Sequence, residues 1–224
     1  MSRPDPDEHA RRLAAASADD PTGWFEELYA AAASGEAGVP WDRGAPHPLL
    51  VHWMEERKPA LTGQKAMVVG CGLGEDAEFV SHQGLETVAF DVSESAVRAA
   101  RRRFPESTVV YQVADLFALP TSWHGAFDLV VESMTVQSLP PPLHERAIDR
   151  VRRLLAPGGT LLVIGMVGDP DRPADGPPWP LTRAEVESFA SGEVRMVRLD
   201  EITDTDRPDV RRWLGEFSRP GADR

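Results

Sequence analysis

A glycine-rich turn is the segment of this chain whose residue types and spacing point most directly to chemistry. Residues 68–76 read VVGCGLGED, with β-branched residues before the glycines and a helical pattern after them. A backbone without Cβ atoms lets a ligand approach closely, and the N-terminus of a helix after such a turn faces that ligand. We therefore expect Gly70, Cys71, Gly72 and Gly74 to contact a bound cofactor.

The acids at the end of this turn narrow the choice of cofactor. A dinucleotide fingerprint places its third glycine at position 75, where this chain has Glu75, and no Gly-Lys-Ser or Gly-Lys-Thr follows, as a triphosphate-binding loop requires. Glu75 and Asp76 would also repel a pyrophosphate. Because S-adenosylmethionine carries no pyrophosphate, the turn favours this sulfonium cofactor over a dinucleotide.

Two further acids follow the next two expected strands. Asp91 comes directly after residues 87–90, where a carboxylate can accept hydrogen bonds from both ribose hydroxyls of an adenosyl group, with Val92 beside it. Asp115 follows the third strand, where it can accept from the adenine amino group while Leu116 packs on the ring. The alternatives are a helix N-cap for Asp91 and a turn aspartate for Asp115.

The fourth expected strand, 127–131, leads directly into Glu132 and Ser133. Ligands of open α/β sheets bind outside the carboxyl ends of the strands, so both residues should lie between cofactor and acceptor. Glu132, His47 and His52 are the candidate general bases for an acceptor that must lose a proton, although proximity alone can suffice. For each histidine, a surface or turn position is the alternative.

The elements that must position these residues alternate along the chain. Short β-branched runs from Lys65 onward are separated by helical patterns, which is typical of parallel strands joined by crossover helices. The expected strands cover residues 66–69, 87–90, 108–113, 127–131 and 160–164. The expected helices cover residues 76–82, 95–104 and 143–155.

Both ends of the chain differ from this middle. Residues 9–33 predict two helices broken around Asp20, which can cap the second one, and a proline-rich loop follows at 39–48. After the fifth strand, residues 168–180 are too rich in Pro, Gly and Asp for regular structure. Two apolar patterns then predict a final antiparallel hairpin, at 194–202 and 211–217.

These elements predict a single α/β domain over residues 1–224. Its centre is a doubly wound, mostly parallel, seven-stranded Rossmann-like sheet with an antiparallel last strand. Residues 1–62 supply N-terminal lid helices and a lid segment, and residues 63–224 supply the cofactor-binding core with its hairpin. We expect a monomer, because no long apolar surface stripe stands out in the sequence.

Composition and charge argue against several classes of partner. The formal charge of −12 disfavours nucleic acid, and the basic run 101–103 falls in an expected helix, where it is typical of a solvated face. No apolar run reaches the roughly 20 residues that span a membrane, and residues 1–20 fit no signal or transit peptide. Cys71 is the only cysteine, so we expect a cytoplasmic protein. Scattered histidines predict no metal site.

The motifs, in their order along the chain, resemble the class I S-adenosylmethionine-dependent methyltransferases. The resemblance covers about residues 65–166. It is carried by the glycine turn, Asp91, Ala114-Asp115-Leu116, Phe127-Asp128-Leu129-Val130 and Ala156-Pro157-Gly158-Gly159. Within that superfamily, residues 39–52, with Pro40-Trp41-Asp42, resemble the thiopurine S-methyltransferase family and the plant thiol and halide methyltransferases. Gly70-Cys71-Gly72, with Val68 before it, also matches that family.

The family resemblance implies that tryptophans before the sheet close over the cofactor. The matching positions are Trp24 and Trp41, with a helix-anchoring core residue as the alternative for Trp24. A third tryptophan of the family falls on Leu28, and the interval through residues 30–38 is longer than usual. Phe or Tyr is common at the position of Ser133, so that match is partial.

The resemblance further implies methyl transfer from S-adenosylmethionine to a small-molecule acceptor, with S-adenosylhomocysteine as product. A thiol acceptor is favoured, because a thiol with a pKa of about 8.5 is already partly thiolate at neutral pH. One alternative is an O- or N-methyltransferase acting on a small metabolite, which the missing aromatic at Leu28 suggests. Another, from a different class, is a non-catalytic module that binds or senses an adenosyl ligand.

Overall fold

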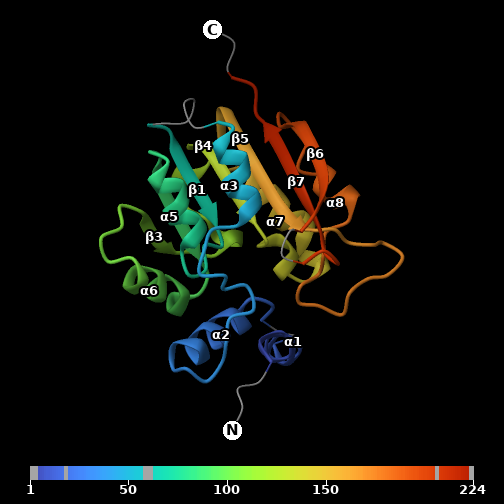
Figure 1. Ribbon diagram of the computed structural model, residues 1–224. Coiled ribbons are helices and arrows are strands. Elements are labelled where there is room, and N and C mark those ends of the chain that lie inside the picture. Colours follow the sequence, from blue (N-terminus) through green and yellow to red (C-terminus); the bar gives the residue numbers. More distant parts are fainter. Residues whose placement is uncertain (1–4, 18–19, 58–62, 205–206, 222–224) are drawn as a thin grey trace.

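A seven-stranded sheet with the order β3-β2-β1-β4-β5-β7-β6 forms the centre of the computed structural model, which describes residues 5–17, 20–57, 63–204 and 207–221. The strands are β1 (Lys65–Val69), β2 (Glu86–Asp91), β3 (Val110–Val113), β4 (Phe127–Ser133), β5 (Leu155–Met166), β6 (Arg195–Thr203) and β7 (Arg211–Ser218). Figure 1 shows the parallel strands running toward the N-terminal helices. The predicted fold class is confirmed.

The pairing directions place a ligand crevice at the middle of the sheet. β1 pairs in parallel with β2 and β4, β2 with β3, and β4 with β5. β7 pairs antiparallel with both β5 and β6, so the last strand lies inside the sheet and β6 forms its edge. The strand order reverses between β1 and β4, and open α/β sheets bind their ligands at such a point.

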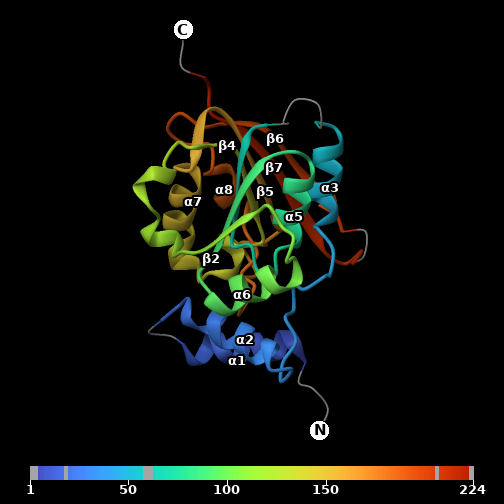
Figure 2. The same cartoon turned by 90° about the vertical axis from the view of Figure 1, so that its left-hand side faces the viewer.

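Different helices cover the two faces of the sheet. The helices are α1 (Pro6–Ala16), α2 (Gly23–Ala33), α3 (Pro48–Glu55), α5 (Glu75–His82), α6 (Glu94–Arg103), α7 (His144–Arg152) and α8 (Arg183–Glu187). Successive strand residues point to opposite faces, so Met67 and Val69 pack with α7 and α8, whereas Ala66 and Val68 pack with α3, α5 and α6. Figure 2 shows these layers. No helix in the described ranges is long and apolar enough to cross a membrane.

The helices α1 and α2 form a small core of their own, which we call the lid. The side chain of Asp20 accepts the backbone N–H groups of Thr22 and Gly23, at 3.2 and 3.0 Å, and so caps the start of α2 as the sequence predicts. Trp24 and Leu28 are fully buried in this core. In Figure 1 the lid lies beyond the carboxyl ends of the parallel strands, where it covers the ligand edge of the sheet.

The helix α8 was not expected, β5 begins at Leu155 rather than at residue 160, and two further elements differ from the sequence-based expectation. The helix α3 was not expected; it begins directly after His47, whose Nδ1 accepts the Leu49 N–H at 3.2 Å. The helix expected over 143–155 ends at Arg152, because Leu155 already pairs with the first residue of β4. The His47 side chain caps the start of α3 inside the expected loop. The pairing of Leu155 with β4 ends α7 earlier than the spacing of its apolar residues predicts.

Candidate active site

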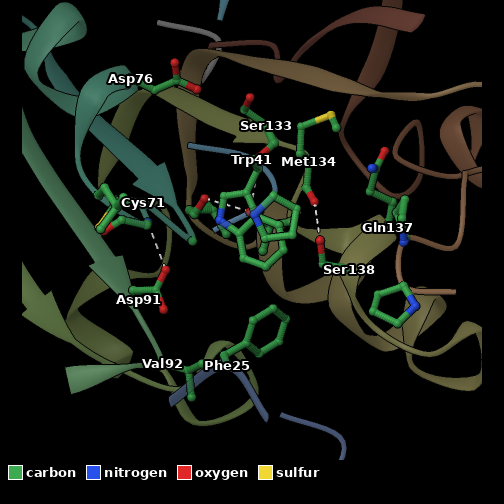
Figure 3. Close-up of a pocket in the computed structure, with 18 of the residues that line it drawn as sticks. Phe25, Trp41, Cys71, Asp76, Asp91, Val92, Ser133, Met134, Gln137 and Ser138 are labelled. Carbon is green, nitrogen blue, oxygen red and sulfur yellow. Dashed lines mark hydrogen bonds between the residues drawn. The ribbon is translucent and has the colours of Figure 1, made fainter. Parts of the chain in front are cut away.

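A cavity of about 340 Å³ lies between the carboxyl ends of the parallel strands and the lid. One side, the glycine-turn end, is lined by residues 70–72, 91–92 and 115–116. The other side, the β4 end, is lined by Asp76, Ser133, Met134 and Arg212. Figure 3 shows Asp91 and Val92 across the cavity from Asp76 and Ser133, with Trp41 between them. The two ends therefore offer adjacent places for two ligands.

The floor of the glycine-turn end is bare backbone. Gly70 and Gly72 have left-handed conformations, with φ of +59° and +52°. A Cβ atom on Gly70 would lie 2.4 Å from Oγ1 of Thr135, and one on Gly72 would lie 2.8 Å from the hydroxyl of Tyr29. Both positions therefore require glycine, for conformation and for space.

The other two residues of the turn have different surroundings. Cys71 lines the cavity, and burial raises the pKa of its thiol well above the ordinary value, so it is a neutral packed group. Gly74 (φ +99°) is absent from the lining; a Cβ atom there would lie 2.5 Å from the Tyr111 hydroxyl. The absence of a side chain at Gly74 lets Tyr111 pack under the turn, and the contact of Gly74 with a cofactor stays a prediction.

Asp91 places a buried carboxylate beside the glycine turn. Its Oδ2 accepts the Gly72 N–H and its Oδ1 accepts the Ser93 N–H, both at 2.9 Å. Burial raises the pKa of Asp91 to about 6, and these backbone hydrogen bonds lower it in part. A carboxylate has about four acceptor sites, so Asp91 retains acceptor capacity for a hydroxyl group in the cavity.

The loop after β3 closes the same end. Asp115 is exposed, lines the cavity and uses Oδ1 to accept the Phe117 N–H at 2.8 Å. Leu116 and Val92 line the cavity beside it. Asp115 is therefore a turn aspartate through Oδ1, and its second oxygen remains available to a ligand.

The aromatic residues of the lid divide between packing and the cavity. Trp24 is 1% exposed and absent from the lining; its ring stacks on Phe25 with 4.0 Å between centroids. Phe25, Tyr29 and Trp41 line the cavity, and the Trp41 Nε1–H donates to the Tyr29 hydroxyl at 2.7 Å. The structure thus places Trp41 as expected, but Phe25 takes the position expected of Trp24.

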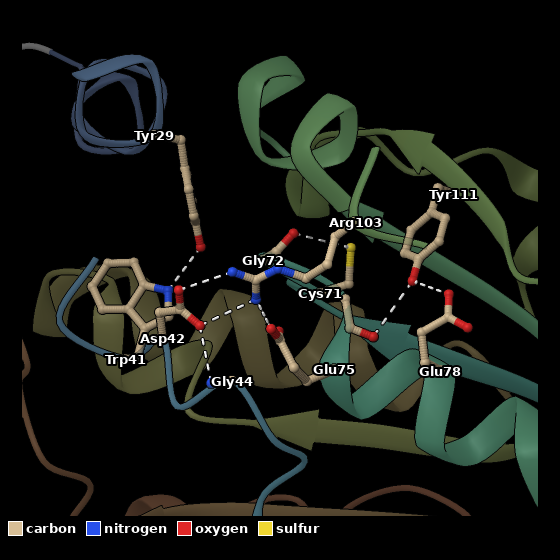
Figure 4. Close-up of polar contacts among 11 residues, drawn as sticks. Tyr29, Trp41, Asp42, Gly44, Cys71, Gly72, Glu75, Glu78, Arg103 and Tyr111 are labelled. Atoms are coloured by element: carbon tan, nitrogen blue, oxygen red, sulfur yellow. Dashed lines mark hydrogen bonds and ion pairs between the residues drawn. The ribbon is translucent and has the colours of Figure 1, made fainter. Parts of the chain in front are cut away.

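An ion-pair cluster, which we call the latch, fastens the loop of Trp41 to the core. Arg103, at the end of α6, donates to both carboxylate oxygens of Asp42 at 3.2 and 3.1 Å, and it also pairs with Glu75 in the first turn of α5. Figure 4 shows Arg103 between the two acids, next to the Trp41–Tyr29 hydrogen bond. Arg103 is therefore not part of a solvated basic face, and the cavity wall is fixed at this point.

Glu132 does not reach the cavity. Its fully buried carboxylate accepts the N–H groups of Thr135 and Val136, at 2.8 and 2.9 Å, and burial raises the pKa of Glu132 to about 7. Neighbouring strand residues point to opposite faces, and it is Ser133 that lines the cavity. The expected catalytic and cofactor-contacting position of Glu132 is therefore corrected to a cap of the loop after β4.

The two candidate histidines have different surroundings. His47 lines the cavity, but it caps α3 through Nδ1, and its backbone N–H donates to Asp76 at 2.7 Å. The side chain of His52 is 64% exposed and lies 3.6 Å from Glu56 on the outer surface of α3. In the described ranges, no three His, Cys, Asp or Glu side chains are grouped as a metal ion would require.

Sequence reasoning missed most of the β4 end. Met134 has a positive φ of 66° and lies at the end of β4. Its sulfur is 3.4 Å from Nη1 of Arg212, a β7 residue that is 4% exposed and whose Nε donates to Asp204 at 2.8 Å. Strained residues of this kind cluster at functional sites. The sequence signal was weak, because Arg212 is one of three charged residues in the strand RRWLGEFS.

The long loop 168–180 completes this end of the cavity. Pro177 and Pro178 line it, whereas Trp179 is absent from the lining and donates its backbone N–H to the Gln137 carbonyl at 2.7 Å. The loop that the sequence predicts to be irregular therefore contributes prolines rather than its tryptophan to the wall.

Known proteins are similar to this chain in sequence. The family model "Thiopurine S-methyltransferase (TPMT)" matches residues 35–216. The chain is 29% identical over 157 residues to "Probable thiol methyltransferase 2" of Arabidopsis thaliana, covering 69% of this chain and 68% of that protein. It is 23% identical over 189 residues to the thiopurine S-methyltransferase of Vibrio atlanticus (strain LGP32), covering 77% and 85%.

A solved structure shares the fold. It is described as "Conversion of a Disulfide Bond into a Thioacetal Group during Echinomycin Biosynthesis" and superimposes with a TM-score of 0.69 at 23% identity, covering 89% of this chain and 94% of that one. The family match includes the latch acids, the glycine turn, Ser133 and Arg212. The cavity thus lies wholly within the matched region apart from the lid helices.

Proposed function

Because the chain belongs to the thiopurine S-methyltransferase family of S-adenosylmethionine-dependent methyltransferases, we propose that its methyl acceptor is a small thiol. The observation that carries this proposal is the family match over residues 35–216, which joins the Trp41 loop and the Gly-Cys-Gly turn in one enclosed cavity. A small thiol fits such a cavity, because a thiolate needs little activation once it is held in line with the methyl group.

The glycine-turn end suits the adenosyl part of the cofactor. Asp91 would accept from the ribose hydroxyls with the capacity that its two backbone hydrogen bonds leave. The free oxygen of Asp115 would accept from the adenine amino group, and Leu116 and Val92 would pack on the ring. Gly70 and Gly72 let the backbone approach the ligand without Cβ atoms.

The remaining residues of the cavity would align the acceptor and exclude water. When bound, S-adenosylmethionine supplies an electrophilic methyl group on its sulfonium sulfur. Positive charge is lost in this in-line displacement, so orientation and a dry cavity can supply much of the acceleration. Phe25 and Trp41 close the cavity from the lid side, and Met134 and Pro177 close it from the other.

We also propose that the protein acts as a single domain and a monomer in the cytoplasm, without a nucleic-acid partner. The net charge of −12 and the use of Arg103 in the latch support the last point, and the lone cysteine Cys71 supports a reducing compartment. Light scattering after size exclusion tests the monomer, and a band shift with tRNA or duplex DNA would contradict the exclusion of nucleic acid.

Transfer of label from methyl-labelled S-adenosylmethionine to a panel of thiols, halides, phenols and amines tests the proposed function. Label on small thiols, lost in Asp91→Ala, is the expected result. Transfer only to phenols or amines would identify an O- or N-methyltransferase instead. Tight cofactor binding without transfer to any acceptor would identify a sensing module.

A further inference from the structure

An acidic side chain that has no part in the proposed adenosyl contacts lies at the β4 end of the cavity. Asp76 is the second residue of α5, is partly buried and lines the cavity together with Ser133. Its carboxylate accepts the backbone N–H of His47 at 2.7 Å, and the side chain of Ser133 lies near enough to lower the pKa of Asp76. Figure 3 shows Asp76 and Ser133 across the cavity from Asp91. Asp76 thus lies where the acceptor, rather than the ribose, is expected.

The surroundings of Asp76 make it a stronger base than an ordinary aspartate. Burial raises the pKa of its carboxyl, while the hydrogen bonds from His47 and Ser133 and the charge of Arg43 lower it in part. The His47 N–H uses one of the roughly four acceptor sites of this carboxylate, so others remain for a proton from the cavity. Ser133 is itself both a donor and an acceptor, and it can pass a proton on.

We propose that Asp76, acting directly or through the Ser133 hydroxyl, accepts the proton that the acceptor loses during methyl transfer. This inference rests on the proposed function for the identity of the acceptor. A lone pair of the acceptor sulfur forms the new S–CH₃ bond, and the bond between the methyl carbon and the sulfonium breaks, its electron pair remaining on the departing sulfur. The S–H proton moves to the Asp76 carboxylate and is later released to water. Mass and charge balance without a further reactant.

Two other roles for Asp76 make different predictions. If the carboxylate binds the ammonium group of the cofactor, its loss weakens cofactor binding. If it only holds the loop before α3 through the His47 N–H, its loss lowers the rate for every acceptor alike. A proton acceptor, in contrast, matters only for acceptors that are still protonated at the working pH, and general-base catalysis typically contributes about 10²–10⁴-fold.

Asp76→Asn, assayed with thiols of different acidity, separates these roles. The amide oxygen still accepts the His47 N–H. For an alkyl thiol with a pKa of about 9 to 10 we expect kcat at neutral pH to fall about 100-fold, and for an aryl thiol that is already ionised to change less than about threefold. The Kd of S-adenosylhomocysteine, measured by calorimetry, should stay within about twofold of wild type. Ser133→Ala should show the same dependence on acceptor acidity, with partial rescue in Ser133→Thr.

Asp128→Asn is the matched control. Asp128 lies at the start of the strand that ends in Ser133, and its carboxylate accepts the Lys65 N–H at 2.9 Å, away from the cavity. It should leave the rate with both thiols unchanged. Melting temperatures of all variants show that each is folded.

Equal losses for both thiols in Asp76→Asn, or a Kd of S-adenosylhomocysteine that rises tenfold or more, would overturn the proposal. If the wild-type enzyme methylates phenols and no thiol, the proposed function fails, but the same comparison with phenols of low and high pKa still tests Asp76. Absence of turnover with any acceptor would contradict both proposals.

Discussion

At the glycine-turn end the floor of the cavity is bare backbone, whereas the β4 end is formed by side chains from four separate segments. The first end depends on Gly70, Gly72 and the hydrogen bonds that Asp91 accepts from the backbone of Gly72 and Ser93. The second joins Asp76 of α5, the end of β4, Arg212 of β7 and the loop 168–180. The comparison teaches that the glycine-turn end is built from motifs that can be recognised in the sequence, whereas the β4 end is built by contacts between segments far apart in the sequence.

The largest expected effect is at Asp91. Two hydrogen bonds from hydroxyls to a charged carboxylate contribute about 3 kcal/mol together, so Asp91→Asn should raise the Kd of S-adenosylhomocysteine about 100-fold by calorimetry. With saturating cofactor, the KM for the acceptor should be unchanged. If the KM for the acceptor rises as much as the Kd of S-adenosylhomocysteine, the two ends of the cavity do not bind separate ligands.

The buried carboxyl of Glu132, which caps the loop after β4, predicts a pH-dependent stability. Its pKa of about 7 in the folded state exceeds the ordinary 4.5, so the folded protein holds this proton more tightly than the unfolded chain. The stabilisation is complete below the pKa that Glu132 has in the unfolded chain. It is lost as the pH rises through the pKa that Glu132 has in the folded protein. Between pH 5.5 and 8.5 the free energy of unfolding should fall by about 2 kcal/mol. Urea unfolding measures it.

Glu132→Gln is the control for this effect. The pH dependence should shrink, leaving the smaller part with the same sign that the raised pKa of Asp91, about 6, contributes. An undiminished slope in the variant would assign the titration to another group.

A smaller and more selective effect is expected at Arg212. Arg212→Lys keeps a positive charge opposite Asp204 but loses the contact of Nη1 with the sulfur of Met134. A freed Met134 side chain should raise the KM for bulky thiols about fivefold, equivalent to about 1 kcal/mol, with the Kd of the cofactor product within about twofold. Steady-state kinetics with a size series of thiols checks this. A uniform loss for all sizes would argue against acceptor selection at this position.

The smallest expected effect is at the latch. Partly exposed ion pairs contribute about 0.2–1 kcal/mol, so Arg103→Gln should speed the release of S-adenosylhomocysteine about threefold at low salt, and high salt should reduce the difference. Stopped-flow tryptophan fluorescence follows the release, with Arg102→Gln, an exposed neighbour on α6, as control. The same rate in both variants would mean that the latch does not hold the cofactor.

The strand order and the cofactor-binding motifs could be predicted because each signal lies within a few residues. The glycine turn, Asp91 and Asp115 all directly follow a strand, so their place at the carboxyl edge follows from the topology. The choice between neighbours could not be made this way. Because successive strand residues point to opposite faces, Ser133 lines the cavity and Glu132 does not. In the lid, Trp24 is buried in the core and the neighbouring Phe25 lines the cavity.

Contacts between distant residues gave no local signal. The approach of Arg212 to Met134 joins residues from β7 and from the end of β4, and the latch joins Asp42 to Arg103. Neither pairing follows from periodicity, because each depends on the packed positions of separate elements. The sequence therefore predicted which segments lie near the β4 end, but not which of their side chains line it.

The insertion of β7 between β5 and β6 has a consequence for the order in which the molecule is made. On the ribosome, β1 to β4 and the glycine turn emerge long before residues 211–218, so the cofactor end can assemble while the chain is still being synthesised. Arg212 arrives only with the last strand, whose pairing with β5 closes the sheet. A chain that stops short of β7 would contain the glycine turn, Asp91 and Asp115 but would lack Arg212 of the β4 end.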